Sequence, residues 1–181
     1  MRRQTLDKLL SWVGVLLSIT LLGAGVGLLI GANFTNSQVR NQLTQQKVYF
    51  PTKTQADYRD LVAAHETQYA GKEVLTGAAA EIFANKIIAV DTLEISGGKT
   101  YAQLSAASLA DPSNAVLKNQ VELVFRGDTL RGLLLNAYAF GVFGVLALWG
   151  AVACFILGVL MVLVTLLGWR HYWLGDPEAT L

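Results

Sequence analysis

Two long apolar runs flank a polar segment in this chain. No residue from Leu9 to Ala32 is charged, and Ser11, Ser18 and Thr20 are the polar side chains of the run. As an α-helix these 24 residues would extend about 36 Å, enough to cross a hydrocarbon core of about 30 Å with some tilt. The apolar part of a secretory signal peptide is shorter, roughly 7–15 residues. The pattern therefore favours an uncleaved transmembrane helix over residues 9–32, with a removed signal peptide as the alternative.

The second apolar run is longer. No charged residue occurs from Gly132 to Trp169, a span of 38 residues, or about 57 Å as a helix. Two crossings would need a turn near the middle, but residues 150–154 contain no Pro, Asn or Asp to form one. We therefore predict one long helix over 132–169. Its apolar body, from about Phe140 onward, would be the second transmembrane helix.

The charges beside the two runs predict their orientation. Arg2, Arg3 and Lys8 precede the first run, and Arg170 with His171 follows the second. Basic residues close to a span are enriched on the cytoplasmic side of a membrane. We therefore expect a multi-pass protein of the plasma membrane with two spans and two cytoplasmic tails, residues 1–8 and 170–181. Residues 33–131 would form an extracytoplasmic domain.

The segment 33–131 has a helical pattern. Asp57 and Asp60 suit the first turn of a helix over about 57–71, where carboxylates meet the positive end of the helix dipole. A second helix is predicted over 77–94, ending at Gly97-Gly98, and a short third one over 101–108. A last helix would begin after Asp111-Pro112-Ser113-Asn114 and lead into the second span. The fold class expected is mainly α.

Two short stretches of this domain could form strands. Residues 47–50 could form a short strand, although four residues decide little. Residues 121–125 could be strand or helix. Lys118, Glu122 and Arg126 are spaced for i, i+4 pairing on a helix, which favours the helical alternative.

Composition excludes several classes of function. Apolar residues make up 53% of the 181 residues and charged residues 15%, against roughly 45–50% and 25% in soluble proteins. The net charge of +1 leaves no basic surface for nucleic acid, so none is expected as a partner. One Cys and two His provide little material for a metal centre or a disulfide. We expect no catalytic residue, cofactor or metal.

Two fragments resemble catalytic motifs but lack required members. In a phosphate-binding loop that ends in Gly98-Lys99-Thr100, the first glycine would fall at position 93, which is Leu93. We interpret these residues as a helix stop with a solvated lysine. His65-Glu66 would need a second His at position 69, which is Tyr69, to form a zinc-protease helix. A surface histidine is the simpler interpretation.

Small residues repeat along both apolar runs. Gly23, Gly27 and Gly31 recur every four residues in the first, and Gly150, Cys154 and Gly158 do so in the second. Small side chains on one face of a helix let another helix approach closely within a membrane. These six residues are the predicted helix-packing interface. The sequence leaves two alternatives equally open, packing of the two spans on each other and packing on a different protein.

Several stretches between residues 47 and 168 resemble a known family. They are Val74–Gly77, Ala80–Ile88, Leu93–Leu104, Leu130–Gly132 and Ala139–Val142, and the most specific of them is the Gly-Gly-Lys-Thr-Tyr-Ala that begins at Gly97. The family comprises small actinobacterial membrane proteins often labelled aromatic ring-opening dioxygenases. The resemblance implies two spans around an exterior helical domain. Iron dioxygenases of the two-His-one-carboxylate type need three protein ligands, but this domain has only His65, so we transfer no catalytic residue.

These features favour a non-catalytic accessory or assembly subunit of a larger plasma-membrane complex. Its expected partners are membrane lipid and other membrane-protein subunits, contacted through the glycine-lined faces. The resemblance to actinobacterial proteins indicates the respiratory supercomplex of a cytochrome bc complex and its oxidase as the candidate assembly. One alternative is an extracytoplasmic ligand-sensing or signalling membrane protein. The other is a cell-envelope enzyme with Asp57, Asp60, His65 and Glu66 gathered in a cleft.

Overall fold

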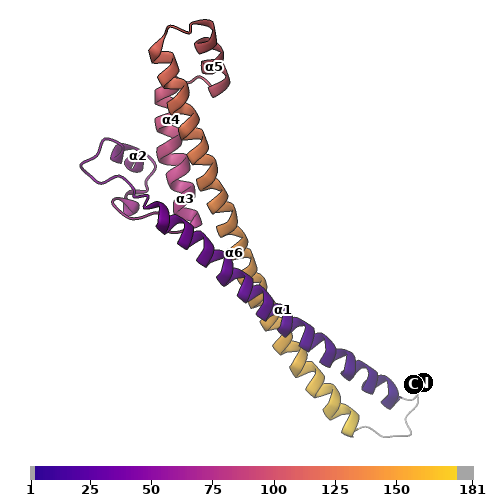
Figure 1. Cartoon of the computed structure of the whole chain (residues 1–181). Helices are drawn as coiled ribbons and strands as arrows, with labels where there is room; N and C mark the ends of the chain where they lie inside the picture. The colour runs from indigo at the N-terminus through magenta and orange to yellow at the C-terminus, as the bar shows by residue number, and fades with distance from the viewer. Residues whose placement is uncertain (1–2, 175–181) are drawn as a thin grey trace. The chain divides into compact units, whose positions relative to one another are not determined.

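The computed structural model describes residues 3–174, and within that range the chain is helical without a strand (Figure 1). Tyr49 and Glu73 form an isolated antiparallel bridge. In chain order the elements are α1 (Arg3–Gln46), α2 (Tyr58–Ala63), the 3₁₀ turn η1 (Thr67–Tyr69), α3 (Gly77–Phe83), the π-helical segment η2 (Ala84–Ile88), α4 (Ala89–Ser96), α5 (Tyr101–Ala110) and α6 (Ala115–Leu174). The mainly α fold class is confirmed. Residues 1–2 and 175–181 of the predicted tails lie outside the described residues.

The chain divides into two compact units. One combines the residues up to Phe34 with those from Gly144 onward, and the other comprises Thr35–Phe143. The sequence placed the boundaries of the middle domain at 33 and 131. The second boundary lies further along because α6 is one continuous helix, and its first part, up to Phe143, packs within the second unit.

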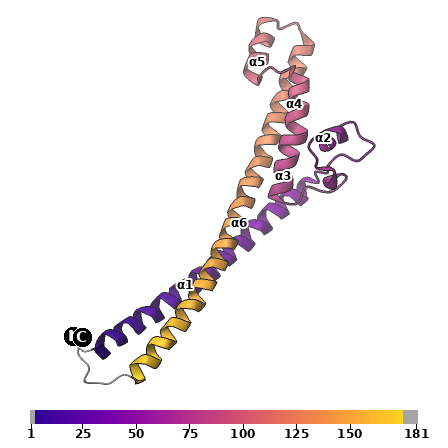
Figure 2. The same ribbon diagram turned by 180° about the vertical axis from the view of Figure 1, so that it is seen from behind.

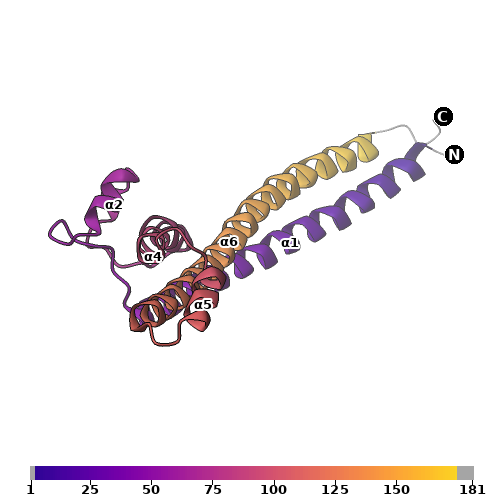
Figure 3. The same cartoon turned by 90° about the horizontal axis from the view of Figure 1, so that it is seen from above.

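In the first unit, α1 and α6 lie side by side and antiparallel (Figures 1 and 3). Gly14 lies against Thr165, Gly25 against Phe155, and Leu28 against Gly150. The residue numbers of the contacts rise along α1 while they fall along α6, as expected for an antiparallel pair. Segments Asp7–Gln46 and Ala115–Trp173 are each long and apolar enough to cross a membrane. The predicted first span, 9–32, and the predicted long helix over 132–169, which includes the second span, lie inside these helices.

Hydroxyl groups in the apolar helices are satisfied locally. Ser11, Ser18 and Thr20 each donate a hydrogen bond to the carbonyl four residues earlier, at 2.8, 2.8 and 2.9 Å. Thr165 does the same toward Met161, at 2.7 Å. Because an unpaired polar group in hydrocarbon costs several kcal/mol, on the order of 2–7, these bonds make the two helices compatible with a lipid environment.

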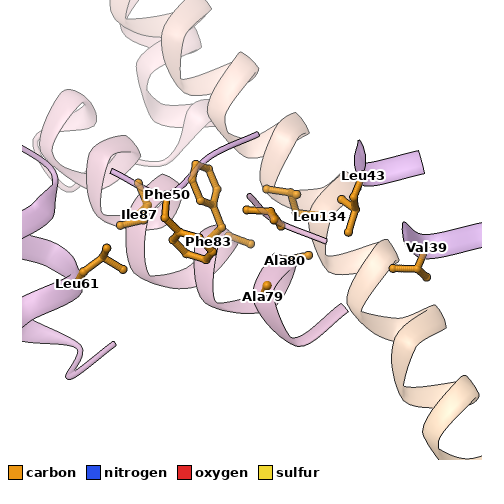
Figure 4. Close-up of a cluster of buried hydrophobic side chains, with 11 residues drawn as sticks. Val39, Leu43, Phe50, Leu61, Ala79, Ala80, Phe83, Ile87 and Leu134 are labelled. Atoms are coloured by element: carbon orange, nitrogen blue, oxygen red, sulfur yellow. The ribbon is translucent and has the colours of Figure 1, made fainter. Parts of the chain in front are cut away.

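The second unit has a hydrophobic core between α1, α6 and the intervening segments (Figure 4). Helices α3 and α4 run along the first part of α6 (Figure 2). The Phe50 ring lies 5.0 Å from that of Tyr69 and 5.3 Å from that of Phe83, measured between centroids. The buried members of the core are Val39, Leu43, Phe50, Leu61, Val74, Ala79, Ala80, Phe83, Ala84, Ile87 and Leu134.

Most predicted helices of this unit are confirmed. Helical structure runs from Gly77 to Ser96, and Gly97 ends it in the left-handed conformation. Thr76 caps its start by accepting a bond from the Ala79 amide at 3.1 Å. Helix α5 covers the predicted 101–108, and α6 begins at Ala115, so residues 121–125 are helical. Glu122 and Arg126 form the expected i, i+4 ion pair.

One possible strand does not form, and one helix ends earlier than predicted. No strand forms at residues 47–50, where the chain makes an isolated bridge. The helix predicted over 57–71 ends at Ala63, and His65 has a positive φ of 59°. The early turn brings Tyr69 back to pack on Phe50. A straight helix would have carried Tyr69 away from the core.

Candidate functional site

The predicted interface residues of α6 lie against α1 with unequal contacts. A Cβ built at Gly158 would lie 2.8 Å from Leu22 Cδ2, and one at Gly150 would lie 3.2 Å from Leu28 Cδ1. Gly158 is buried, and Gly150 is half-buried. Cys154, between them in sequence, is a half-buried free cysteine. The glycines of α6 therefore accommodate leucine side chains of α1.

The predicted interface residues of α1 are placed differently. Gly23 and Gly27 are exposed, and a Cβ at either position would meet no atom within 4 Å. Gly31, one turn further along the same side, is half-buried. We call the surface at Gly23 and Gly27 the open glycine face. Within the described residues, neither helix covers it.

The α1 residues that do contact α6 were missed by sequence reasoning. A Cβ at Gly25 would lie 3.0 Å from the Phe155 ring, and Gly14 lies against the Thr165 hydroxyl. At the same end of the pair, a Cβ at Gly168 would lie 3.1 Å from Ser11 Oγ. Four-residue spacing drew attention to Gly23 and Gly27, whereas Gly14 and Gly25 are eleven residues apart. Eleven residues correspond to about three turns of an α-helix, which is a periodicity that could have found them.

An acidic cluster lies in the second unit, where α2 meets α4. The Arg59 guanidinium donates from Nη2 to both carboxylate oxygens of Glu94, at 2.6 and 2.7 Å. Asp60 has a side chain that is only 10% exposed, and its Oδ2 is buried without a hydrogen-bond partner in the described structure. Arg59 also lies 3.6 Å from Asp60 Oδ1. One arginine is thus shared between two carboxylates from different elements.

Asp91 belongs to this cluster and has a raised pKa. Burial, followed by the negative charges of Asp57, Asp60 and Glu94, raises the pKa of Asp91 to about 6. Arg59 opposes this rise. The cluster differs from the predicted cleft because Asp91 and Glu94 take the place of His65 and Glu66. Asp91 and Glu94 are visible in the sequence as two acids one turn apart in the helix predicted over 77–94. That they lie close to Asp57 and Asp60 depends on how α2 packs, which the sequence does not show.

His65 and Glu66 lie outside the group of charges that act on Asp91. The His65 side chain is exposed, and Glu66 accepts a hydrogen bond from Gln68. Within residues 3–174, no group of three or more His, Cys, Asp and Glu residues has a geometry that could hold a metal ion. The acidic cluster can store a proton near pH 6 and tie α2 to α4.

The glycine-lysine segment forms the turn between α4 and α5. Gly97 and Gly98 both have positive φ, 59° and 79°, which glycine adopts without steric cost. Thr100 Oγ1 accepts from the Gln103 amide at 3.3 Å, and Gln103 Oε1 accepts from the Thr100 amide at 3.0 Å. This is a capping box. The segment is therefore a helix stop followed by a helix start, as interpreted from the sequence.

No family model, curated protein or solved structure matches this chain.

Proposed function

We propose that this protein is a non-catalytic accessory or assembly subunit of a larger plasma-membrane complex. The observation that carries the proposal is the open glycine face of α1. A side chain of the opposite helix occupies the space beside five glycines of the pair, which are Gly14, Gly25, Gly150, Gly158 and Gly168. Gly23 and Gly27 lie in the same helix pair, but a Cβ built at either position would meet no atom of another element within 4 Å.

The physical argument rests on how helices associate in lipid. Lipid tails are as apolar as leucine, so exposure of apolar side chains alone does not drive helices together. Close approach of backbones does so through van der Waals contact, and it requires small residues at the contact. The open glycine face meets this requirement and is not used by α6. A helix of another subunit would fit there.

The proposed topology follows from the flanking charges. Lys8 precedes the apolar part of α1 and Arg170 follows that of α6, so both ends would be cytoplasmic and residues 33–131 extracytoplasmic. The resemblance to actinobacterial membrane proteins points to the respiratory supercomplex of cytochrome bc complex and oxidase as the assembly. A co-purified respiratory complex would be visible through its haem absorbance.

The test compares tagged full-length variants purified in mild detergent from the native membrane. The double variant Gly23→Leu/Gly27→Leu fills the open glycine face. Ala153→Leu adds the same kind of bulk at an exposed position of α6 and is the matched control. We expect haem-containing subunits to co-purify with the wild type and the control, and to be lost from the double variant.

Two results would contradict the proposal. If the wild-type protein purifies alone as a monodisperse species, it is not a subunit of a larger complex under these conditions. Partners retained equally by the double variant would show that the open glycine face is not the contact. Partners without haem would leave the subunit proposal standing and exclude the respiratory complex.

A further inference from the structure

A cavity of about 270 Å³ lies in the second unit, where the end of α4 and the start of α5 face α6. Its apolar part includes Leu93 and Val124, and its polar part includes Lys99, Thr100 and Arg131. These residues come from three different elements. The volume is near the lower end of small-molecule sites, which span roughly 300–1,000 Å³.

The two cations of the cavity keep their charge available. Lys99 forms no ion pair with any described residue. Arg131 donates from Nε and Nη2 to Asn85 Oδ1, at 3.3 and 3.0 Å. Because the Asn85 amide is neutral, it positions the guanidinium without cancelling its charge. The remaining Arg131 donors are free to bind an anion.

Asn85 is itself held in place. It lies in the π-helical segment η2, and its Nδ2 donates to Glu81 Oε1 at 2.7 Å. The amide orientation is thereby determined, with its oxygen directed to Arg131. A π-helical turn widens a helix locally and often occurs at functional sites. Here it carries Asn85, the residue that orients the half-buried Arg131 guanidinium.

The lining carries one negative charge as well, from Asp128. Lys99 and Arg131 together with Asp128 give a net charge of +1. This balance matches one negative charge on a ligand better than two. The start of α5 adds partial positive charge, because the first amides of a helix have no acceptor within it. Leu93 and the Tyr101 ring, which packs 5.7 Å from Phe125 between centroids, offer an apolar surface.

We propose that this cavity binds a small organic monocarboxylate, with the carboxylate between Lys99 and Arg131 and its apolar body against Leu93 and Tyr101. A nucleoside triphosphate does not fit, because a phosphate-binding loop wraps phosphates in successive backbone amides. In this turn the Gly97, Gly98 and Lys99 amides already donate to carbonyls of α4. The cavity is also small for a nucleotide.

The test uses the full-length protein in detergent micelles and 4-fluorobenzoate as the probe. Broadening of its ¹⁹F resonance, relative to protein-free micelles, measures binding. We expect a Kd on the order of 1 mM, as is usual for so small a ligand. 4-Fluorobenzyl alcohol, which lacks the charge, and 4-fluorophenyl phosphate, which carries a second one, should both bind several-fold more weakly.

Three variants locate the binding. Lys99→Gln should weaken 4-fluorobenzoate binding about tenfold, the usual effect of losing a charge-assisted hydrogen bond. Asp128→Asn should strengthen binding and reduce the discrimination against the phosphate. Lys118→Gln is the control, since Lys118 is an exposed lysine of the same unit that does not line the cavity. The substituted side chains of Lys99 and Asp128 are exposed, so these variants should fold.

Each remaining outcome overturns the proposal. The first is that the protein causes no broadening of the ¹⁹F resonance when 4-fluorobenzoate is present at a concentration ten times the expected Kd. Equal broadening of the alcohol and the benzoate would show that only apolar contact matters. Equal loss of benzoate binding in Lys99→Gln and Lys118→Gln would indicate general charge attraction and no defined site.

Discussion

Gly77 of α3 and Gly141 of α6 touch backbone to backbone. A Cβ placed on Gly77 would lie 3.0 Å from the Gly141 Cα, and one placed on Gly141 would lie 3.0 Å from the Gly77 Cα. A Cβ on Gly77 would also lie 3.0 Å from the carbonyl oxygen of Ala137. Backbone atoms cannot rotate aside as a long side chain can. The two helices are therefore held at a separation that only glycine permits.

Gly77→Ala should destabilise the second unit by about 1–3 kcal/mol, the usual cost of overpacking a close contact. Gly141→Ala should have a similar effect, because it places its methyl group in the same gap. Thermal unfolding followed by circular dichroism of the purified full-length protein measures the change.

Gly132→Ala is the control for this pair. Gly132 also lies in α6, but a Cβ there would meet nothing within 4 Å. Alanine in a helix interior is favoured over glycine by about 1 kcal/mol, so this variant should be neutral or more stable. Equal destabilisation by all three substitutions would contradict the close-contact interpretation.

Asp91→Asn should remove a pH dependence of the contact between α2 and α4. The folded protein raises the pKa of Asp91 from 3.8 to about 6, so it binds a proton more tightly than the unfolded chain does. Asp91 therefore contributes stability below about pH 4, and that contribution is lost as pH rises through 6. Hydrogen exchange of residues 58–63 should accelerate between about pH 4 and 6, after correction for intrinsic rates, in the wild type but not in Asp91→Asn.

The other charges of the cluster provide the control for this effect. Asp57→Asn removes one of the negative charges that raise the Asp91 pKa. The acceleration should then occur at lower pH than in the wild type. Asp128→Asn, outside the cluster, should leave the pH profile of α2 exchange unchanged. A profile that is insensitive to both Asp91 and Asp57 would refute the assignment.

Phe50→Ala should destabilise the second unit by about 3–5 kcal/mol, the range for a phenylalanine removed from a core. Phe50 is 1% exposed, and its ring packs on both Tyr69 and Phe83. Tyr49→Ala is the neighbouring control, because Tyr49 is 55% exposed. Denaturant unfolding monitored by tyrosine and tryptophan fluorescence would distinguish the two. A small effect of Phe50→Ala would show that segment 47–74 is not anchored to the core.

Thr100→Ala should weaken the start of α5 by about 1 kcal/mol, the typical value of an N-cap side chain. The variant loses the hydrogen bond that the Gln103 amide donates to Thr100 Oγ1, whereas the bond from the backbone amide of residue 100 to Gln103 Oε1 needs no side chain at position 100. Faster hydrogen exchange in residues 101–110, with no change in α6, is the expected result. Thr129→Ala, at a mid-helix threonine that bonds to the Phe125 carbonyl, should not accelerate exchange in α5.

The sequence predicted the elements whose signals are local. Thr76 and Gly97 delimit a helix through capping and left-handed geometry, and both act within a few residues. The two helices that are long and apolar enough to cross a membrane follow from hydrophobic length alone. The end of α2 at Ala63 could not be predicted, because it depends on the distant packing of Tyr69 on Phe50. Local propensity for helix continues past that point.

The candidate sites show the same division. Spacing identified Gly150 and Gly158, but it could not assign Gly23 and Gly27 to an uncovered side, since this depends on how α6 lies against α1. The proximity of Asp57 to Asp91 is a tertiary contact, and the π-helical turn at Asn85 interrupts the single helix predicted over 77–94. No short-range pattern of apolar and polar residues encodes either feature.

The helix pair of the first unit alternates in which partner supplies the glycine. Gly14 and Gly25 of α1 receive Thr165 and Phe155, whereas Gly158 and Gly168 of α6 receive Leu22 and Ser11. Sliding one helix by a single turn would move each of these four side chains away from the glycine that it now contacts. These contacts on both helices therefore define the lengthwise register of α1 against α6.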